Sequence, residues 1–263
     1  MRRKMRVWIW LAWFLAGLAS AAVRTEVLEY RIEGEPFTGY LAWDDKVSGA
    51  RPGVLVVHEW WGHNEYARRR ARELAAAGYV ALALDMYGKG RVTEHPDDAK
   101  RFMQAVLAEQ GLARRRFEAA YRLLLAQPQT DRTHVAAIGY CFGGGVVLNM
   151  ARAGLPLDAV VSFHGMLGTD RPARPGTVRP RVLVFTGEAD PFVPGEQVAA
   201  FEREMRAAGA RFELIRYPGV KHAFTNPDAD RLGREYDLPL KYDAQADRDA
   251  WQRMLAFLRQ ALR

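Results

Sequence analysis

The sequence contains one cysteine, Cys141, at the centre of the segment Gly139-Tyr140-Cys141-Phe142-Gly143-Gly144. The apolar run 135–138 before it is typical of a short buried strand, and residues 144–153 have the apolar spacing of a helix. A strand, a Gly-x-nucleophile-x-Gly turn and a helix together form a nucleophile elbow. The turn is so tight that its flanking positions leave no room for a Cβ atom. We therefore predict that Cys141 is a nucleophile, the alternative being a buried structural cysteine.

Two further side chains suited to acyl transfer follow along the chain. Asp190 comes after the apolar run 182–185, and His222 comes after the run 212–217. Sites in open α/β sheets form at the carboxyl ends of strands, so all three side chains are expected at one edge. Alone, Asp190 would be interpreted as a turn residue and His222 as a structural histidine. The order of nucleophile, acid and histidine instead favours a Cys-His-Asp triad.

Each member of this triad has an expected role. A thiolate is the competent nucleophile, and His222 can take the thiol proton and later protonate the leaving group. Asp190 can fix the tautomer of the imidazole ring. The backbone N–H groups of Phe142 and Trp60 are predicted to form the oxyanion hole. Glu59 follows the same strand as Trp60 and is expected near the thiol.

The segment His58-Glu59-Trp60-Trp61-Gly62-His63 superficially resembles a zinc site. A metalloprotease helix places its two histidines four residues apart, whereas His58 and His63 are five apart and follow a strand. We therefore expect no metal, and no cofactor. Trp61 is expected to line an apolar acyl pocket together with Trp60, and simple packing of the two aromatic side chains is the alternative.

The elements that position these residues alternate between strands and helices. Strands are expected at 27–32, 37–43, 53–57, 79–84, 135–138, 159–163, 182–185 and 212–217. Helices are expected at 65–77, 96–109, 112–126, 144–153, 195–208 and 244–262. This alternation predicts an α/β-hydrolase fold, a mostly parallel twisted sheet with helices on both faces, and the first two strands form an antiparallel hairpin. Residues 169–180 and 226–240 are expected to be loops.

Residues 1–22 have the composition of a secretory signal peptide. A basic start, 1–6, precedes the apolar stretch 7–18 and the small residues Ala19-Ser20-Ala21. An uncleaved membrane anchor is the alternative, because the apolar stretch is near the lower limit for spanning a bilayer. We predict that residues 23–263 form a single exported, periplasmic domain. With one cysteine, such a domain can form no internal disulfide.

The charge of the chain gives no argument for a nucleic-acid partner. The formal net charge is +7, but four basic residues lie in the predicted signal peptide. Without residues 1–21 the chain has 34 basic and 31 acidic residues, a net charge of +3. A nucleic-acid-binding domain is usually much more basic. We also expect no association with a membrane once the signal peptide is removed.

The motifs resemble those of the dienelactone hydrolase family, the carboxymethylenebutenolidases. The segments that carry the resemblance are 58–62, 85–89, 139–144, 187–190 and 222–224. The resemblance extends over about residues 25–262 and implies a monomeric or weakly associating hydrolase that needs no cofactor. It implies cleavage of a small-molecule lactone or ester through an acyl-thiol intermediate. It also implies that Glu59 takes part in activating the cysteine when substrate binds.

The chain departs from the family pattern at two positions. The family member that acts on dienelactone holds the substrate carboxylate with two arginines, where this sequence has Lys89 and Asn226. Lysine lacks the bidentate fork of arginine, and asparagine has no charge. We expect Lys89 and Asn226, with Trp61, Tyr87 and Phe224, to contact a substrate other than dienelactone. A broad carboxylesterase or thioesterase and a non-catalytic binding protein are the alternative functions.

Overall fold

The computed structural model describes residues 23–109 and 111–263, and the predicted signal peptide lies outside them. The strands are β1 (Val23–Ile32), β2 (Glu35–Asp44), β3 (Arg51–Val57), β4 (Val80–Leu84), β5 (Thr130–Tyr140), β6 (Ala159–Phe163), β7 (Arg181–Gly187) and β8 (Phe212–Tyr217). The helices are α1 (Glu65–Ala76), α2 (Pro96–Ala108), α3 (Leu112–Leu125), α4 (Phe142–Arg152), α5 (Gly195–Ala207), α6 (Ala229–Glu235) and α7 (Ala244–Ala261). Each strand and helix expected from the sequence is present. None of the helices in these residues is long and apolar enough to cross a membrane.

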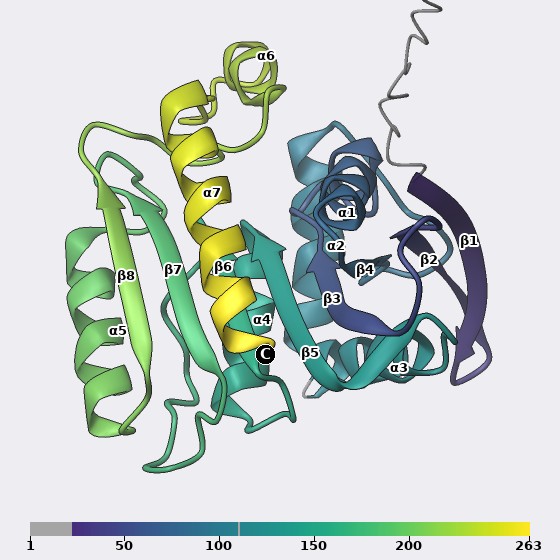
Figure 1. Cartoon of the computed structure of the whole chain (residues 1–263). Coiled ribbons are helices and arrows are strands. Elements are labelled where there is room, and N and C mark those ends of the chain that lie inside the picture. Colours follow the sequence, from purple (N-terminus) through teal and green to yellow (C-terminus); the bar gives the residue numbers. More distant parts are fainter. Residues whose placement is uncertain (1–22, 110) are drawn as a thin grey trace, which may run out of the picture.

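The strands form one eight-stranded sheet in the order β1-β2-β4-β3-β5-β6-β7-β8 (Figure 1). The hairpin of β1 and β2 is antiparallel and joins β4 in antiparallel fashion, whereas the pairs from β4 to β8 are parallel. The central strands β4 and β6 are buried along their whole length, as expected for strands covered on both faces. This arrangement confirms the predicted fold class.

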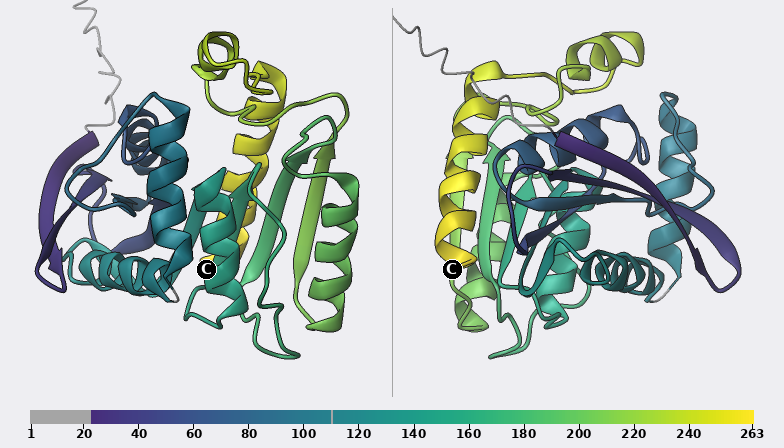
Figure 2. Two further views of the ribbon diagram at one scale, coloured as in Figure 1. Left: turned by 180° about the vertical axis from the view of Figure 1, so that it is seen from behind. Right: turned by 45° about the vertical axis from the view of Figure 1, so that its right-hand side comes forward.

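Helices cover both faces of the sheet (Figures 1 and 2). Side chains of α1 and α7 pack with Val54 and Val56 on one face. Side chains of α3, α4 and α5 pack with Leu55 and Val57 on the other. Successive residues of β3 therefore serve opposite cores, because side chains alternate across a strand. This layering holds the carboxyl ends of the parallel strands together at one edge.

Several sequence-based expectations differ from the structure in detail. The strand expected at 135–138 is longer, because polar residues from Thr130 onward pair with β3 across a register shift at Pro52/Gly53. The elbow helix begins at Phe142, two residues before the predicted start. The expectation that residues 226–240 form only a loop is wrong, since they include α6. That helix buries Ala229 and Leu232, and its one apolar face is too short for a periodic signal.

Candidate active site

The turn between β5 and α4 consists of Cys141 alone. Its backbone has φ 51° and ψ −117°, in a region that residues with a Cβ rarely adopt. A Cβ atom at Gly139 would lie 2.1 Å from the Gly143 carbonyl oxygen, and one at Gly143 would lie 2.4 Å from the Val57 carbonyl oxygen. These are contacts with backbone atoms, which cannot move aside as a flexible side chain could. The prediction that the turn needs glycine for lack of space is confirmed.

The side chains of Cys141, His222 and Asp190 lie together at the carboxyl edge of the sheet. His222 Nδ1 is 2.7 Å from Asp190 Oδ2, and both side chains are buried. The Cys141 side chain is partly exposed and lies close enough to the His222 ring to influence its pKa. Burial alone would lower the pKa of His222, but the Cys141 sulfur and the Asp190 carboxylate raise it to about 10. An imidazole in this position can hold a proton beside a thiolate.

Glu59 is a buried carboxyl group near this imidazole. Its Oε2 accepts a hydrogen bond of 2.6 Å from Asn226 Nδ2, and its Oε1 has no partner among the described residues. Burial raises the pKa of Glu59 to about 7, although the Asn226 hydrogen bond and the nearby His222 oppose this shift. Glu59 therefore exchanges its proton near neutral pH, where most glutamates are fully ionised.

The two amides expected to form an oxyanion hole are available as donors. The backbone N–H of Phe142 begins α4, and a first-turn amide has no acceptor within its own helix. The Trp60 N–H likewise donates no hydrogen bond within residues 23–109 and 111–263. The Trp60 peptide is fixed by the Tyr87 hydroxyl, which donates a hydrogen bond of 2.9 Å to the Trp60 carbonyl oxygen.

The five residues expected to contact substrate lie in different surroundings. Tyr87 is buried and supports the Trp60 loop, and Asn226 supports Glu59. Trp61 packs under α6, as in the alternative of simple aromatic packing, and Phe224 is fully buried against His164. Lys89 forms an exposed ion pair of 2.7 Å with Glu35 on the β1–β2 hairpin. Most of these five residues therefore support other parts of the site and do not form a surface for substrate.

His164 is not among the residues predicted from the sequence, yet it contacts the backbone of the elbow. The Cys141 N–H donates to His164 Nδ1 at 3.2 Å and to the Phe163 carbonyl oxygen at 3.0 Å. His164 Nε2 is 2.7 Å from Thr225 Oγ1. Burial, with the nearby His222, holds the pKa of His164 well below its usual range. His164 is therefore a neutral ring whose proton is on Nε2, since Nδ1 must accept from the Cys141 amide.

A signal for His164 was present in the sequence. His164 directly follows the buried run 159–163, just as Asp190 and His222 follow the next two strands. Its ring centroid lies 5.2 Å from that of His222. A polar residue at the end of each parallel strand is therefore a better guide to this edge than the order of three residue types alone.

His58 and His63, the histidines on either side of Glu59 in the sequence, are both buried. No group of three or more potential ligands occurs among the described residues. His58 Nε2 accepts the Met86 N–H at 3.1 Å, and His58 Nδ1 bonds the Glu59 carbonyl oxygen. Burial lowers the pKa of His63 to about 3, so that its ring is neutral as well.

Comparison with known proteins places this chain among hydrolases. The sequence pattern of the Dienelactone hydrolase family matches residues 37–262. The crystal structure of the dienelactone hydrolase-like promiscuous phosphotriesterase P91, from metagenomic libraries, superposes with a TM-score of 0.87 at 35% identity. The match covers 93% of this chain and all of P91.

Curated sequences give the same result. "Protein usf" of Aquifex pyrophilus is 29% identical over 245 residues, which cover 90% of this chain and 99% of that protein. The "Putative carboxymethylenebutenolidase" of Escherichia coli (strain K12) is 28% identical over 240 residues, covering 87% of this chain and 84% of the relative. The similarity thus extends over nearly the whole length of each protein.

The burial of Glu59 predicts a loss of stability with rising pH. The unfolded chain releases this proton near pH 4.5, whereas the folded protein holds it up to about pH 7. Stability therefore falls between these two values, and the whole penalty of about 3 kcal/mol is present above pH 7. Glu59→Gln should remove this dependence, so that urea unfolding shows a smaller difference between pH 5 and pH 8. Glu29→Gln, at an exposed site, should leave the wild-type difference. Equal pH dependence in Glu59→Gln and wild type would contradict the shift.

The two contacts of His164 can be separated by two substitutions. Asparagine places an oxygen near the Nδ1 position and keeps an acceptor for the Cys141 N–H. Glutamine keeps only an amide group near the Nε2 position, which faces Thr225. Both variants should lose about 1 to 3 kcal/mol of stability, because each loses one buried hydrogen bond. We expect Cys141 alkylation by iodoacetamide to be about tenfold slower in His164→Gln than in His164→Asn, the ratio that 1.4 kcal/mol represents. Equal alkylation rates in the two folded variants would show that the Nδ1 contact does not position the thiol.

Proposed function

Because the chain belongs to the dienelactone hydrolase family, we propose that it cleaves small carboxylic esters and lactones with Cys141 as nucleophile. The observations that support this most are the 2.7 Å contact between His222 and Asp190 and the influence of the Cys141 sulfur on the pKa of the His222 ring. The family membership establishes a hydrolase on an α/β-hydrolase fold, and the roles of individual residues are our proposal.

In the first half of the reaction, the thiolate of Cys141 attacks the carbonyl carbon and a C–S bond forms. The electron pair of the C=O double bond moves to oxygen, where the Phe142 and Trp60 amides donate hydrogen bonds. The tetrahedral intermediate then expels the alkoxide. The His222 imidazolium gives its proton to this leaving group, and an acyl thioester remains on Cys141.

In the second half, water attacks the thioester carbonyl and the neutral His222 ring takes the water proton. The C–S bond breaks, the acid is released and the thiolate is restored beside the imidazolium. Asp190 stabilises the imidazolium in both halves and holds its Nδ1 in place. The cycle thus ends with the same thiolate and imidazolium with which the attack begins.

Glu59 supplies a second proton-transfer group. Its Oε2 is fixed by Asn226, and its free Oε1 is the oxygen that would exchange a proton with the thiol. With a pKa of about 7, this carboxyl can be ionised when it takes a proton and neutral when it returns one. We propose that Glu59 helps to form the Cys141 thiolate.

The reacting end of the substrate is proposed to be uncharged. Asn226 is occupied by Glu59, and Lys89 is paired with Glu35, so neither is available to hold a carboxylate next to the ester. An anionic group beside the scissile bond would also lie near the buried Glu59. This favours simple esters and neutral lactones over dienelactone itself.

Cys141→Ala should abolish hydrolysis of p-nitrophenyl acetate and of γ-butyrolactone, since the nucleophile is lost. His222→Gln should lower kcat/KM by at least about a thousandfold, the range seen when a general base and its partners act as a unit. The control is His134→Gln, which removes a histidine paired with Asp131 far from the elbow and should keep the wild-type rate. Folding of each variant is checked by circular dichroism. Hydrolysis of the ester by folded Cys141→Ala at the wild-type rate would refute the proposal, and the ratio of the two wild-type rates separates a lactonase from an open-chain esterase.

A further inference from the structure

Arg70, on α1, is a buried cation that the proposed mechanism does not use. Its side chain is only 6% exposed, and arginine is almost never buried to this extent unless it is paired. Its partners are Asp247 on α7 and Glu73 on α1, which lies 2.9 Å from Arg70 Nη1. Taking an ion pair out of water costs free energy, so that such a pair is weak evidence for stability. Arg70 is therefore a candidate for a role in the site.

The guanidinium group of Arg70 also bonds the loop that carries His222. Arg70 Nη2 donates a hydrogen bond of 2.9 Å to the Thr225 carbonyl oxygen. Thr225 is fully buried, and no backbone N–H among the described residues donates to this oxygen. A buried carbonyl group that lost its donor would destabilise the loop. Arg70 thus ties α1 to the segment 222–226.

This segment needs a support, because its backbone is strained. Ala223 has a φ of 59°, in the left-handed region that favours glycine. His222 directly precedes Ala223, and Asn226, which donates to Glu59, follows three residues later. Strained backbone persists only when the surrounding structure over-determines it. A contact at Thr225, between the two functional side chains, therefore helps to position both.

Two hydroxyl groups extend the same support to the elbow. The Tyr66 hydroxyl, on α1, is 2.6 Å from Thr225 Oγ1 and 3.5 Å from Arg70 Nε. Thr225 Oγ1 is in turn 2.7 Å from His164 Nε2, and the His164 ring accepts the Cys141 N–H. A continuous row of buried polar contacts thus runs from Arg70 to the backbone of the candidate nucleophile.

The charge of Arg70 acts on Glu59 as well. Burial is the largest influence on the pKa of Glu59, and the Asn226 hydrogen bond opposes it. The ionisable side chains that interact with this carboxyl group electrostatically are His222, Arg70, Asp228 and Tyr66. The two cations lower the pKa of Glu59, and the charge of an arginine does not change with pH in the range where proteins are folded. Arg70 therefore favours the carboxylate form at every working pH.

We propose that Arg70 is a positioning residue of the active site. It holds the segment that carries His222 and Asn226 through the Thr225 carbonyl oxygen, and it places a permanent positive charge within reach of Glu59. Because Arg70 is buried, it acts through these groups and not on the substrate, so that it affects kcat and not KM. This inference rests on the proposed esterase function.

The alternative is that Arg70 only joins α1 to α7. Asp247→Asn separates the two roles, because it breaks the ion pair between the helices but leaves the cation and its hydrogen bond to Thr225. The direction of the pKa shift also separates them. Structural loosening would expose Glu59 and lower its pKa toward 4.5, the ordinary value, whereas loss of a nearby cation would raise the pKa.

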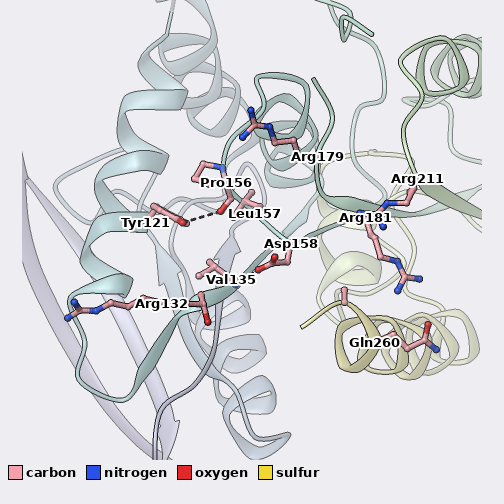
Figure 3. Close-up of a pocket in the computed structure, with 12 residues that line it drawn as sticks. Tyr121, Arg132, Val135, Pro156, Leu157, Asp158, Arg179, Arg181, Arg211 and Gln260 are labelled. Carbon is pink, nitrogen blue, oxygen red and sulfur yellow. Dashed lines mark hydrogen bonds between the residues drawn. The ribbon is translucent and has the colours of Figure 1, made fainter. Parts of the chain in front are cut away.

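A matched control lies at the other end of the sheet. Arg181 pairs with a carboxylate, Glu213 at 3.7 Å, and its guanidinium carbon is 4.9 Å from the ring centre of Phe257 on α7. Arg70 lies over Trp251 of the same helix in a similar way, at 5.1 Å. Figure 3 shows Arg181 beside the last turns of α7, in a pocket where β5, β6 and β7 begin. Arg181→Met thus removes a comparable contact with α7 far from Glu59.

The test uses the double variant Arg70→Met/Asp247→Asn, which removes the cation without leaving an unpaired buried carboxylate. Neutral side chains of similar size often replace a buried ion pair without loss of folding. The pKa of Glu59 is followed by carbon NMR of its carboxyl group, assigned by the absence of the signal in Glu59→Gln. We expect this pKa to rise by at least about half a pH unit in the double variant. At pH 9, kcat for p-nitrophenyl acetate should fall about tenfold with KM unchanged, as for the loss of one buried hydrogen bond.

Three further variants complete the comparison. Arg70→Lys keeps the charge and should restore the pKa of Glu59 to within about 0.2 pH units of the wild-type value, although lysine lacks the fork that bonds several partners. Asp247→Asn and Arg181→Met keep the cation near Glu59, so that neither should raise this pKa.

An unchanged or lowered pKa of Glu59 in the folded double variant would overturn the inference, and so would an equal rise in Asp247→Asn or in Arg70→Lys. A raised pKa with the wild-type kcat would show that Arg70 does not position the loop. If wild type does not hydrolyse p-nitrophenyl acetate at all, the proposed esterase function fails. The NMR titration, which needs no turnover, still decides whether Arg70 acts on Glu59.

Discussion

The candidate site depends on holding one residue, Cys141, in a backbone conformation that its own side chain disfavours. Two devices make this possible. Glycines at 139 and 143 let the strand, the helix and β3 approach within distances that exclude a Cβ atom. The Cys141 N–H is then fixed by the Phe163 carbonyl oxygen and by His164 Nδ1. Strain at a nucleophile persists only when the surroundings over-determine it, and here the core of the fold does so.

Around this turn, the pKa values of similar buried groups are shifted in opposite directions, according to the neighbours of each group. His164 is buried against a hydroxyl and a cationic neighbour, so that it stays neutral. His222 is buried as well, but the carboxylate and the sulfur beside it favour its charged form. The burial of Glu59 outweighs its hydrogen bond with Asn226 and the nearby charge of His222, so that its pKa is raised to about 7. Groups whose pKa values are moved apart in this way are typical of catalytic sites.

The sequence was enough to predict the fold class, because buried parallel strands are continuous apolar runs and the elbow has a distinctive pattern. It also predicted that Asp190 and His222 would meet, since each follows a parallel strand, and the two side chains are 2.7 Å apart. It did not predict what supports them: His164 behind the elbow and Tyr87 beneath the Trp60 loop bond to backbone atoms, which leaves no pattern of residue types. The role of Lys89 is implied by the resemblance, and that of Trp61 is predicted from the loop after a strand. Their actual contacts with Glu35 and α6 depend on loop paths that spacing does not determine.

The central claim is that the sulfur of Cys141 forms a covalent acyl intermediate. Rapid quenching of the enzyme during turnover of p-nitrophenyl acetate, followed by mass spectrometry of its peptides, tests this most directly. We expect an acetyl group on the peptide that contains Cys141, formed as fast as the first equivalent of p-nitrophenol is released. Steady turnover with no acyl group on this peptide, or with the group on another residue, would contradict it.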